Sequence, residues 1–338
     1  MSAITQPSLQ MENGAGSGQR QRHWLNLPLH PRTEGTFEDV LNALPHFGRQ
    51  PFAMASVNGD GLGVNSYLDM VYRLPVRQSE RSIPVGVVSK NYRLVDHHQI
   101  LRNIQQSLAG RGVDVEQVQV VAEWTIHGER AHFSIIFPQE TRFTMGTVEN
   151  RDEMRFRIEI FNSVDGSCRL MAIAGWLRFV CSNGLIIGTA LMQLRQQHRQ
   201  QLEVEEISRL VGDAIESARG DKSMIERWMS TRVEKDALVS WTDEEVNAQW
   251  GPKAAVRVLR VAMEGWDVEP VGDLRNRRPS EIRATRVGKV PVPGIDAPVH
   301  SLFGVSQVLS WIAGQRGEIN QDFEWRSQVH DLIAKLDV

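Results

Sequence analysis

The sequence predicts an α+β fold, in which an antiparallel β-meander sheet with packed helices precedes a mostly helical C-terminal region. Two observations carry this prediction. Up to about residue 192, apolar and polar residues mostly alternate, as the two faces of a β-strand require. From about Gln193 onward the apolar residues recur every 3.6 positions, which is typical of helices. Strands therefore come first and helices after, which argues against an alternating parallel α/β fold.

The length of 338 residues suits about two folded units of ~150 residues each. Residues 1–30 contain much Gln, Ser and Gly and few large apolar residues, so we expect them to be disordered. We expect an α+β core domain over residues 37–200 and a helical region over residues 201–338. Within the helical region, residues 272–298 form a polar loop that contains arginine and proline.

The first strands are expected at residues 52–57, 64–73 and 85–89, because each is an apolar stretch bounded by turn-forming residues. Asp96 can then cap a helix over residues 97–109. Four residues of that helix are spaced for one buried face: Ile100, Leu101, Ile104 and Leu108.

Two hairpins follow this helix. The first joins residues 117–127 to residues 130–137 through Gly128-Glu129, a pair that suits a tight hairpin turn. The second joins residues 155–161 to residues 169–174. Its alternation places one set of side chains on one face, Phe156, Ile158 and Ile160, and another set on the opposite face, Arg155, Arg157 and Glu159.

Helices are expected through the second half of the chain. Residues 207–218 carry an apolar stripe, and the sequence Thr242-Asp-Glu-Glu245 has the pattern of a capping box that begins a helix. Pro252 lies near the start of the next helix, because proline is favoured in a first turn. Two final helices are expected around residues 305–312 and 329–336.

Composition excludes several classes of protein. The formal net charge is −3, so a nucleic-acid site must be a local patch rather than a general coat of positive charge. The two cysteines, Cys168 and Cys181, are too few for a disulfide scaffold or a cysteine-rich zinc site, which fits a reducing cytoplasm. No apolar run approaches the ~18 residues of a membrane span, so we expect no membrane partner.

The chain also lacks the common motifs of catalysis. It contains no G-x-x-x-x-G-K-[ST], H-E-x-x-H, C-x-x-C or G-x-S-x-G. His97 and His98 are adjacent at the start of a helix, where their side chains point about 100° apart and cannot easily hold one ion. We therefore predict no catalytic residues, no cofactor and no metal, and a protein that is not an enzyme.

Arginine is the unusual feature. Six of the 38 basic residues are lysine and the other 32 are arginine, which reflects either codon usage or a choice of guanidinium groups for phosphate contacts. Two groups are ordered along the chain. A sheet-face set comprises Arg155, Arg157, Arg169 and Arg178, and a loop set comprises Arg275, Arg277, Arg278, Arg283, Arg286 and Lys289.

Both sets have an alternative interpretation without a ligand. The loop set is either a polyanion contact or a solvated loop. Cross-strand arginines in the sheet-face set repel each other unless an anion or a carboxylate such as Glu159 separates them. Trp176 and Phe179 near Arg178 either stack on bases or belong to the core.

A turn of the form N-S-x-D-G and a following R-x-V-C-x-N-G-L segment resemble the DUF932 family, a group of phage- and plasmid-associated proteins. The resemblance extends over about residues 50–310 and implies a role in a mobile genetic element, such as replication, recombination or conflict with host defence. The order of elements also resembles the Rad52-like single-strand annealing fold by topology alone. The motif positions that we interpret as structural are Asn162, Asp165, Gly166, Cys181, Asn183 and Gly184.

We therefore expect a cytoplasmic, DNA-binding protein of a mobile element, with single-stranded DNA as its partner and annealing or recombination as its role. The alternative is a protein-interaction module that binds a host restriction, defence or recombination protein, or that regulates the element. That alternative rests on an acidic helical region, Glu203, Glu205, Glu206, Asp213 and Glu216. A homo-oligomer is compatible with either function.

Overall fold

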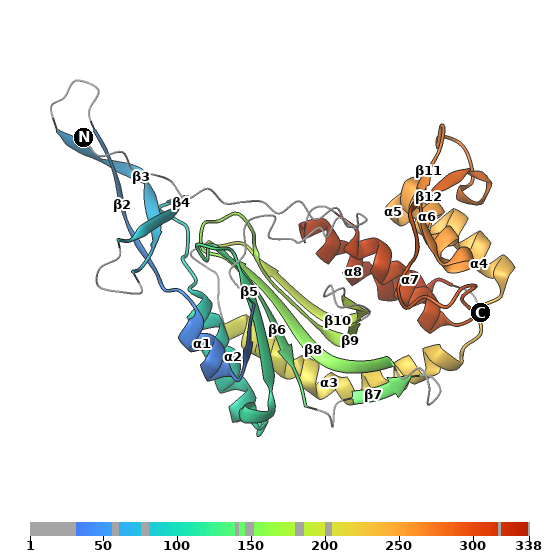
Figure 1. Ribbon diagram of the computed structural model, residues 1–338, viewed down its shortest axis with the longest axis horizontal. Coiled ribbons are helices and arrows are strands. Elements are labelled where there is room, and N and C mark those ends of the chain that lie inside the picture. The colour runs from blue at the N-terminus through green and yellow to red at the C-terminus, as the bar shows by residue number, and fades with distance from the viewer. Residues whose placement is uncertain are drawn as a thin grey trace.

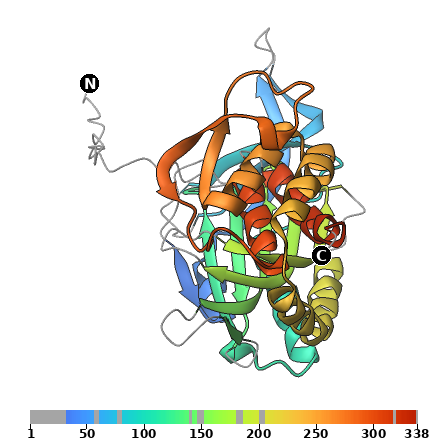
Figure 2. The ribbon, with the colours of Figure 1, turned by 90° about the vertical axis from the view of Figure 1, so that its right-hand side faces the viewer.

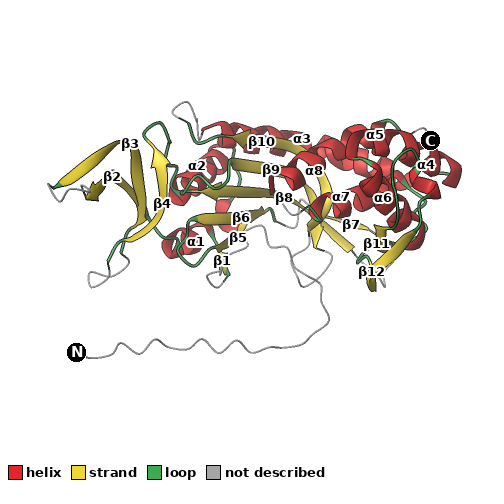
Figure 3. Cartoon of the chain, turned by 90° about the horizontal axis from the view of Figure 1, so that it is seen from above, coloured by secondary structure: helices red, strands yellow, loops and turns green. Residues whose placement is uncertain are grey.

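The computed structural model describes residues 32–55, 61–75, 81–138, 142–145, 152–179, 186–199, 205–316 and 319–336. The predicted disordered segment, residues 1–30, lies outside these ranges. The described molecule is elongated (Figures 1 and 3). A small three-stranded sheet lies at one end, a larger sheet with its helices in the middle, and the C-terminal helices at the other end.

The larger sheet is antiparallel throughout, with strand order β1-β5-β6-β8-β9-β10 and β7 paired to β8. The predicted α+β class with antiparallel sheets is thus confirmed, as are both hairpins. The Rad52-like topology stays a prediction. The strands are β1 (Thr33–Gly35), β5 (Gln119–Trp124), β6 (Arg130–Ile136), β7 (Arg142–Met145), β8 (Asp152–Ser163), β9 (Leu170–Phe179) and β10 (Ile186–Gln196).

Helices α2 (His97–Gly110) and α3 (Glu205–Ser230) cover one face of this sheet (Figure 1). Asp96 caps α2 as predicted, and its Oδ1 accepts a hydrogen bond from the backbone N–H of His98 at 3.1 Å. The apolar stripe of α2 is buried in the same core cluster as Phe156, Ile158 and Ile160 of β8. The short helix α1 (Phe37–Ala43) begins with a capping box between Thr36 and Asp39, and a single 3-10 turn, Val115–Gln117, precedes β5.

The small sheet has strand order β2-β3-β4, formed by β2 (Phe47–Ala55), β3 (Leu62–Arg73) and β4 (Ile83–Ser89). Much of it is open to solvent, and Tyr67 is 79% exposed. An ion pair between Arg49 and Asp69 at 2.5 Å, joined by Lys90, links its strands on one side. The sheet therefore rests on few apolar contacts, chiefly Phe47, Val71 and Val88.

The C-terminal region is helical but also contains a two-stranded β-ribbon. Its helices are α4 (Lys235–Trp241), the π-helical turn η3 (Thr242–Val246), α5 (Asn247–Trp250), α6 (Pro252–Glu264), α7 (Leu302–Gly314) and α8 (Ile319–Ala334). Its strands are β11 (Trp266–Pro270) and β12 (Ala284–Pro291). The predicted helix start near Pro252 is confirmed, and α7 contains the expected residues 305–312. Helix α8 begins at Ile319, before the expected residues 329–336, and the expected loop at 272–298 contains β12.

The capping-box prediction at Thr242 was wrong. Residues 235–250 form one continuous helical run, and the Thr242 hydroxyl donates to the carbonyl of Leu238 at 2.7 Å within it. A threonine hydroxyl satisfied by the preceding turn cannot cap a new helix, so the acidic residues that follow lie inside the run. The break comes later, at Gly251, whose φ of 83° suits glycine and ends α5.

The hydrophobic core is continuous across the expected domain boundary at residue 200. Helix α3 packs on α2, β9 and β10, although it follows that boundary in the sequence. Buried residues of α7 and α8, such as Val308 and Leu332, belong to the same cluster of contacts as Ile158 of the sheet. The sheet and the C-terminal helices therefore bury one shared apolar surface.

Candidate nucleic-acid interface

The loop set of arginines lies on the β-ribbon and on the segment that connects its two strands. Strands β11 and β12 pair antiparallel, with Val268 opposite Arg286 and Pro270 opposite Ala284. The connecting segment includes a 3-10 turn, η4 (Pro279–Glu281). Figure 2 looks at the molecule from the side of the C-terminal helices and shows the ribbon, in orange, to the left of these helices.

The ribbon is anchored to the helices behind it. Asp243 accepts hydrogen bonds from the backbone N–H of Ser280 at 2.8 Å and from its hydroxyl at 2.5 Å. Ile282 is fully buried against Val256 of α6 and Val268 of β11. Because the base of the connecting segment is fixed, its outer side chains are displayed on a preorganised frame, which lowers the entropy lost on binding.

The arginines of this segment point outward from the anchored base. Five arginines and two carboxylates, Asp273 and Glu281, leave residues 271–286 with a formal charge of +3. All five of these arginines are exposed: Arg275, Arg277, Arg278, Arg283 and Arg286. Position 289 lies in β12, but the side chain of Lys289 lies outside what the structure describes.

The exposed arginines differ in what they already contact. Arg286 lies over the Trp266 ring at 4.1 Å and 3.8 Å from Glu264. Arg277 donates to the carbonyl of Glu281 at 3.3 Å. Arg275, Arg278 and Arg283, by contrast, form no ion pair with any residue that the structure describes.

The basic residues of the neighbouring helix α6 are paired instead. Arg257 forms a bidentate contact with Asp267 at 2.8 and 2.6 Å. Arg260 pairs with Glu264 at 2.9 Å, and Lys253 with Glu269 at 2.5 Å. The Arg257 and Lys253 contacts reach β11 and hold α6 against the ribbon, whereas the Arg260 pair lies within α6. The charge available to an anion therefore lies on the ribbon rather than on the helix.

The sheet-face set does not form the predicted groove. Arg157 is 1% exposed, so its guanidinium cannot reach a nucleic acid, and the prediction for this residue was wrong. Arg155 and Arg169 are half-buried. Arg155 pairs with Leu177 across the two strands, so position 178, the next residue, falls on the opposite face of the sheet from Arg155. The Arg178 side chain lies outside the described residues.

Trp176 belongs to the core, at 2% exposure and in edge contact with the ring of Phe156. A base cannot stack on a buried ring, so the interpretation of Trp176 as core is the correct one. The Phe179 side chain lies outside the described residues.

Arg157 instead takes part in a buried network of charges on the face of β8 opposite α2. Its Nε lies 3.5 Å from Oε1 of Glu159. The other carboxylate oxygen of Glu159 accepts from Ser134 at 2.5 Å and from Nε2 of His132 at 2.7 Å. Glu123 lies 3.8 Å from Nδ1 of His132. Strand alternation placed Arg157 and Glu159 on one face, but only the tertiary structure shows that this face is buried.

These neighbours alter the acidity of the buried groups. Burial alone raises the pKa of Glu159, but Arg157 and His132 beside it, together with the hydrogen bonds, outweigh burial, and the pKa is lowered. Burial alone lowers the pKa of His132, yet the carboxylates of Glu123 and Glu159 outweigh it, and the pKa is raised. Glu159, Arg157 and His132 therefore each favour the charged form of the oppositely charged neighbour.

The N-S-x-D-G segment lies in the turn between β8 and β9 and contacts the start of α2. Asn162 is fully buried, and its side-chain amide donates to the carbonyl of Val95 at 3.1 Å and to Nδ1 of His97 at 2.9 Å. Nε2 of His97 donates to the carbonyl of Gly128 at 2.8 Å. This pattern requires neutral His97 with its proton on Nε2, in agreement with burial, which lowers the pKa of His97.

The same turn joins the two sheets. The Tyr92 hydroxyl, which lies just beyond β4, donates to the carbonyl of Ser163 at 3.0 Å. Gly166 has a φ of 79°, and a Cβ at this position would lie 3.3 Å from the Tyr92 ring. Asp165 accepts from the backbone N–H of Ser167 at 3.0 Å. Within the described residues, the motif thus acts as a packing and hydrogen-bonding junction.

A family model for a domain of unknown function, DUF932, matches residues 84–250, which include this junction and α2. The chain belongs to the DUF932 family. No curated protein and no solved structure matches the chain. Since the family is described as one of unknown function, membership assigns no reaction and no ligand.

The DUF932 match is narrower than the expected resemblance over residues 50–310. It ends at Trp250, before α6 and the ribbon, so the arginine-bearing ribbon lies outside the matched residues. Three motif positions, Cys181, Asn183 and Gly184, lie outside the described residues. Cys168 is buried, and burial raises the pKa of its thiol to about 12, so it is not a reactive nucleophile.

The DUF932 region also contains a buried histidine that makes the fold sensitive to acid. His198 stacks on Tyr92 with ring centroids 5.1 Å apart, and its Nδ1 lies 3.3 Å from the carbonyl of Arg93. Burial lowers the pKa of His198 to about 4. An unfolded histidine titrates near 6.5, so between these values the unfolded chain binds more protons than the folded one.

We therefore expect the free energy of unfolding to have its full value above about pH 6.5 and to decrease as the pH falls toward 4. The comparison is urea denaturation of the wild type and of His198→Gln at pH 7.5 and 4.5. Between pH 7.5 and 4.5 the free energy of unfolding should fall by about 2 kcal/mol more in the wild type than in the variant, since one pKa unit corresponds to about 1.4 kcal/mol. Equal losses in the two proteins would contradict a buried, neutral His198.

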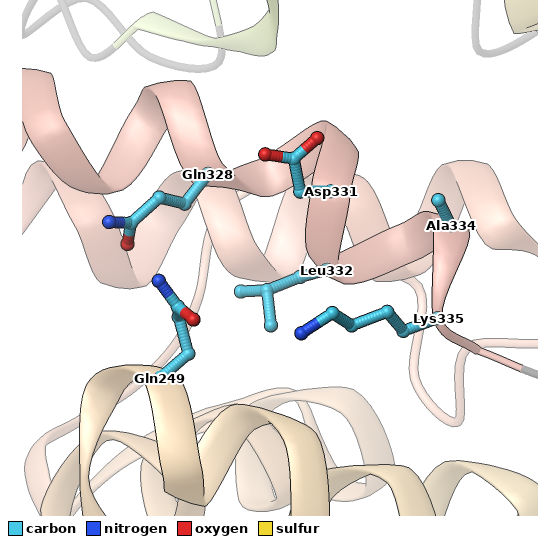
Figure 4. Close-up of a pocket in the computed structure, with 6 residues that line it drawn as sticks. All are labelled: Gln249, Gln328, Asp331, Leu332, Ala334 and Lys335. Atoms are coloured by element: carbon cyan, nitrogen blue, oxygen red, sulfur yellow. The ribbon is translucent and has the colours of Figure 1, made fainter.

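A hollow of about 370 Å³ lies between α5 and α8 (Figure 4). Two of its lining side chains already make contacts between helices. Gln328 accepts a hydrogen bond from the Trp250 indole at 2.7 Å, and Lys335 pairs with Glu245 at 2.9 Å. The hollow therefore reflects helix packing, and it holds no arrangement of nucleophile and base.

Within the described part of the chain, no helix is long and apolar enough to cross a membrane.

Proposed function

We propose that this DUF932 protein binds DNA through the arginines of its β-ribbon. The observation that carries the proposal is the group of Arg275, Arg278 and Arg283, three exposed arginines on one anchored segment that have no carboxylate partner among the described residues. Exposed cations held in place without counter-charges suit phosphate groups, which guanidinium binds through paired hydrogen bonds. Because the net charge of the chain is −3, binding to a polyanion requires a local basic site of this kind.

Single-stranded DNA is the ligand that we favour, with strand annealing or recombination in a mobile element as the wider role. Annealing needs neither a nucleophile nor a metal: it requires neutralised backbones and base edges that remain free to pair. The ribbon supplies phosphate contacts at the edge of the molecule, and a homo-oligomer would align several ribbons along one strand.

The alternative, a protein-interaction module, receives less support. Glu216 of the acidic helical region pairs with Arg111 at 2.7 Å, and Glu206 with Arg209 at 3.5 Å. Glu205 and Asp213 are exposed, and Glu203 lies outside the described residues. The charges of Glu206 and Glu216 are thus already used within the molecule.

The test is filter binding of labelled single-stranded DNA over a series of salt concentrations. Each phosphate contact contributes about 0.7 to the slope of log K against log salt concentration for a single strand. The triple variant Arg275→Ala, Arg278→Ala, Arg283→Ala is expected to bind more weakly at low salt and to lower the slope by about 2.

A matched control removes the same number of charges from the helices: Arg102→Ala, Arg209→Ala, Arg227→Ala. These residues lie on α2 and α3, away from the ribbon, and we expect an unchanged slope. Equal effects of the two triple variants would show that only net charge matters. Undetectable binding by the wild type at low salt would refute the proposed function, and a host protein retained after nuclease treatment would favour the alternative.

A further inference from the structure

Three metal-ligating side chains meet where α1, β2 and α2 come together. His46 lies between α1 and β2, Asp96 caps α2, and His98 lies in the first turn of α2. Their ligand atoms all lie within 4.8 Å of one another. This group lies far along the chain from the arginine ribbon, and nothing in the proposed DNA binding uses it.

The distances between these atoms suit a single small ion. Nδ1 of His98 lies 3.1 Å from Oδ1 of Asp96, and Nδ1 of His46 lies 3.6 Å from Oδ2 of Asp96. In a tetrahedral zinc site, with ligands about 2.0–2.2 Å from the metal, neighbouring ligand atoms lie about 3.3–3.5 Å apart. The two measured separations bracket that value, so small side-chain movements would place three ligands around one ion.

The hydrogen bond on the far side of His98 is of the kind that metal-binding histidines make. Its Nε2 lies 2.9 Å from the carbonyl of Leu41 in α1, which fixes a proton on Nε2. With that proton on Nε2, a bare Nδ1 would direct its lone pair at the Asp96 carboxylate, so either a second proton or a metal cation must lie between the two acceptors. A cation between them satisfies both, and ligating histidines usually donate their second N–H to a carbonyl or carboxylate in this way.

His46 is the adjustable member of the group. Its ring stacks on that of His98, with centroids 3.6 Å apart and planes 11° apart, and its side chain is 60% exposed. Two parallel rings cannot both direct lone pairs at one ion, so His46 must tilt on binding, and its exposure permits this. The Asp96 carboxylate is better fixed, since it accepts from the backbone N–H of His98 at 3.1 Å and of Phe47 at 3.4 Å.

We propose that His46, Asp96 and His98 form a binding site for one divalent transition-metal ion, best suited to Zn²⁺. Two imidazoles and a carboxylate match the ligands that zinc takes, whereas Mg²⁺ and Ca²⁺ prefer all-oxygen sites. The partly exposed position leaves a fourth site for water. An ion there would join the end of α1 and the start of β2 to the first turn of α2.

Local sequence does not reveal this group, because only His97 and His98 are adjacent in the chain. Those two side chains diverge, and the structure separates their roles: His97 is buried against Asn162, whereas His98 turns toward Asp96. The third member, His46, lies 50 residues before Asp96, and no local motif connects the two.

The test is titration of Zn²⁺ into the chelator-treated full chain without a histidine tag, with a competing chromophoric chelator as the readout. We expect one equivalent of Zn²⁺ to bind. His46→Ala, which changes an exposed residue, should weaken binding at least tenfold. Asp96→Ser keeps a residue that caps helices well but removes the carboxylate, and should weaken binding at least as much.

The control is His127→Ala, an exposed histidine outside the group, which should leave the affinity unchanged. Co²⁺ added in place of Zn²⁺ should give the intense visible absorption of a tetrahedral site in the wild type and not in His46→Ala. Circular dichroism confirms that each variant is folded. No stoichiometric binding by the wild type, or equal binding by the wild type and His46→Ala, would overturn the proposal.

Discussion

Replacing Glu159 by alanine is expected to lower the free energy of unfolding by about 3–5 kcal/mol, the usual cost of removing one partner from a buried ion pair. The variant removes the carboxylate 3.5 Å from the Arg157 guanidinium and 2.7 Å from the His132 ring. Arg157 is 1% exposed and Glu159 is 3% exposed, so bulk water cannot take the place of the missing charge. The measurement is urea denaturation at pH 7.5.

Two further variants separate the loss of a pair from the loss of a side chain. Glu234→Ala removes a carboxylate that pairs with Arg232 at 3.0 Å where both side chains are more than 70% exposed, and it should cost under about 1 kcal/mol. The double variant Arg157→Met, Glu159→Leu should recover much of the stability lost by Glu159→Ala, because apolar residues of similar volume often replace a buried pair at little cost. A loss below 1 kcal/mol for Glu159→Ala would contradict a buried network.

Replacing Asn162 by alanine is the second large effect, with an expected loss of about 2–4 kcal/mol. The variant leaves two buried acceptors without their donor, the carbonyl of Val95 and Nδ1 of His97. Each buried acceptor left unpaired costs about 1–3 kcal/mol. Chemical denaturation of the wild type and the variant at pH 7.5 measures the loss.

The matched control for Asn162 is Ser167→Ala in the same turn. The Ser167 hydroxyl donates to Asp165 and accepts from Arg130, but both contacts are exposed, so we expect a loss below about 1 kcal/mol. A long-range ¹H–¹⁵N spectrum should also show His97 with its proton on Nε2 in the wild type. Equal losses for the two variants, or a proton on Nδ1 of His97, would contradict the role assigned to Asn162.

The junction at Asn162 shows what the N-S-x-D-G segment does in this chain. The turn must present an amide to α2, a carbonyl to Tyr92 and a left-handed residue at Gly166. These demands come from one segment, residues 92–97, and from the turn itself, so several positions of one short segment are constrained together. The motif therefore identifies the fold of the DUF932 region and says nothing of what the protein binds.

Local sequence was sufficient wherever the deciding interaction is local. The alternation in residues 155–161 predicted β8, and the spacing of Ile100, Ile104 and Leu108 together with Asp96 predicted α2, because side-chain periodicity and capping depend on residues within a few positions of each other. The arginines at 275–286 were equally visible, because they are close together in the chain. Thr242 shows the limit: its local pattern is that of a cap, but the helix that begins at Lys235 continues through it.

Burial and long-range proximity depended on the tertiary structure. Arg155 and Arg157 have the same alternation and charge, yet Arg157 is buried beside Glu159 and Arg155 only half so, a difference set by what packs over each position. His46 and Asp96 meet across 50 residues because α1 packs against α2. The sequence carries each residue's chemistry and its local geometry, whereas the solvation that decides whether a charge binds a ligand or stabilises the core arises only when distant segments pack together.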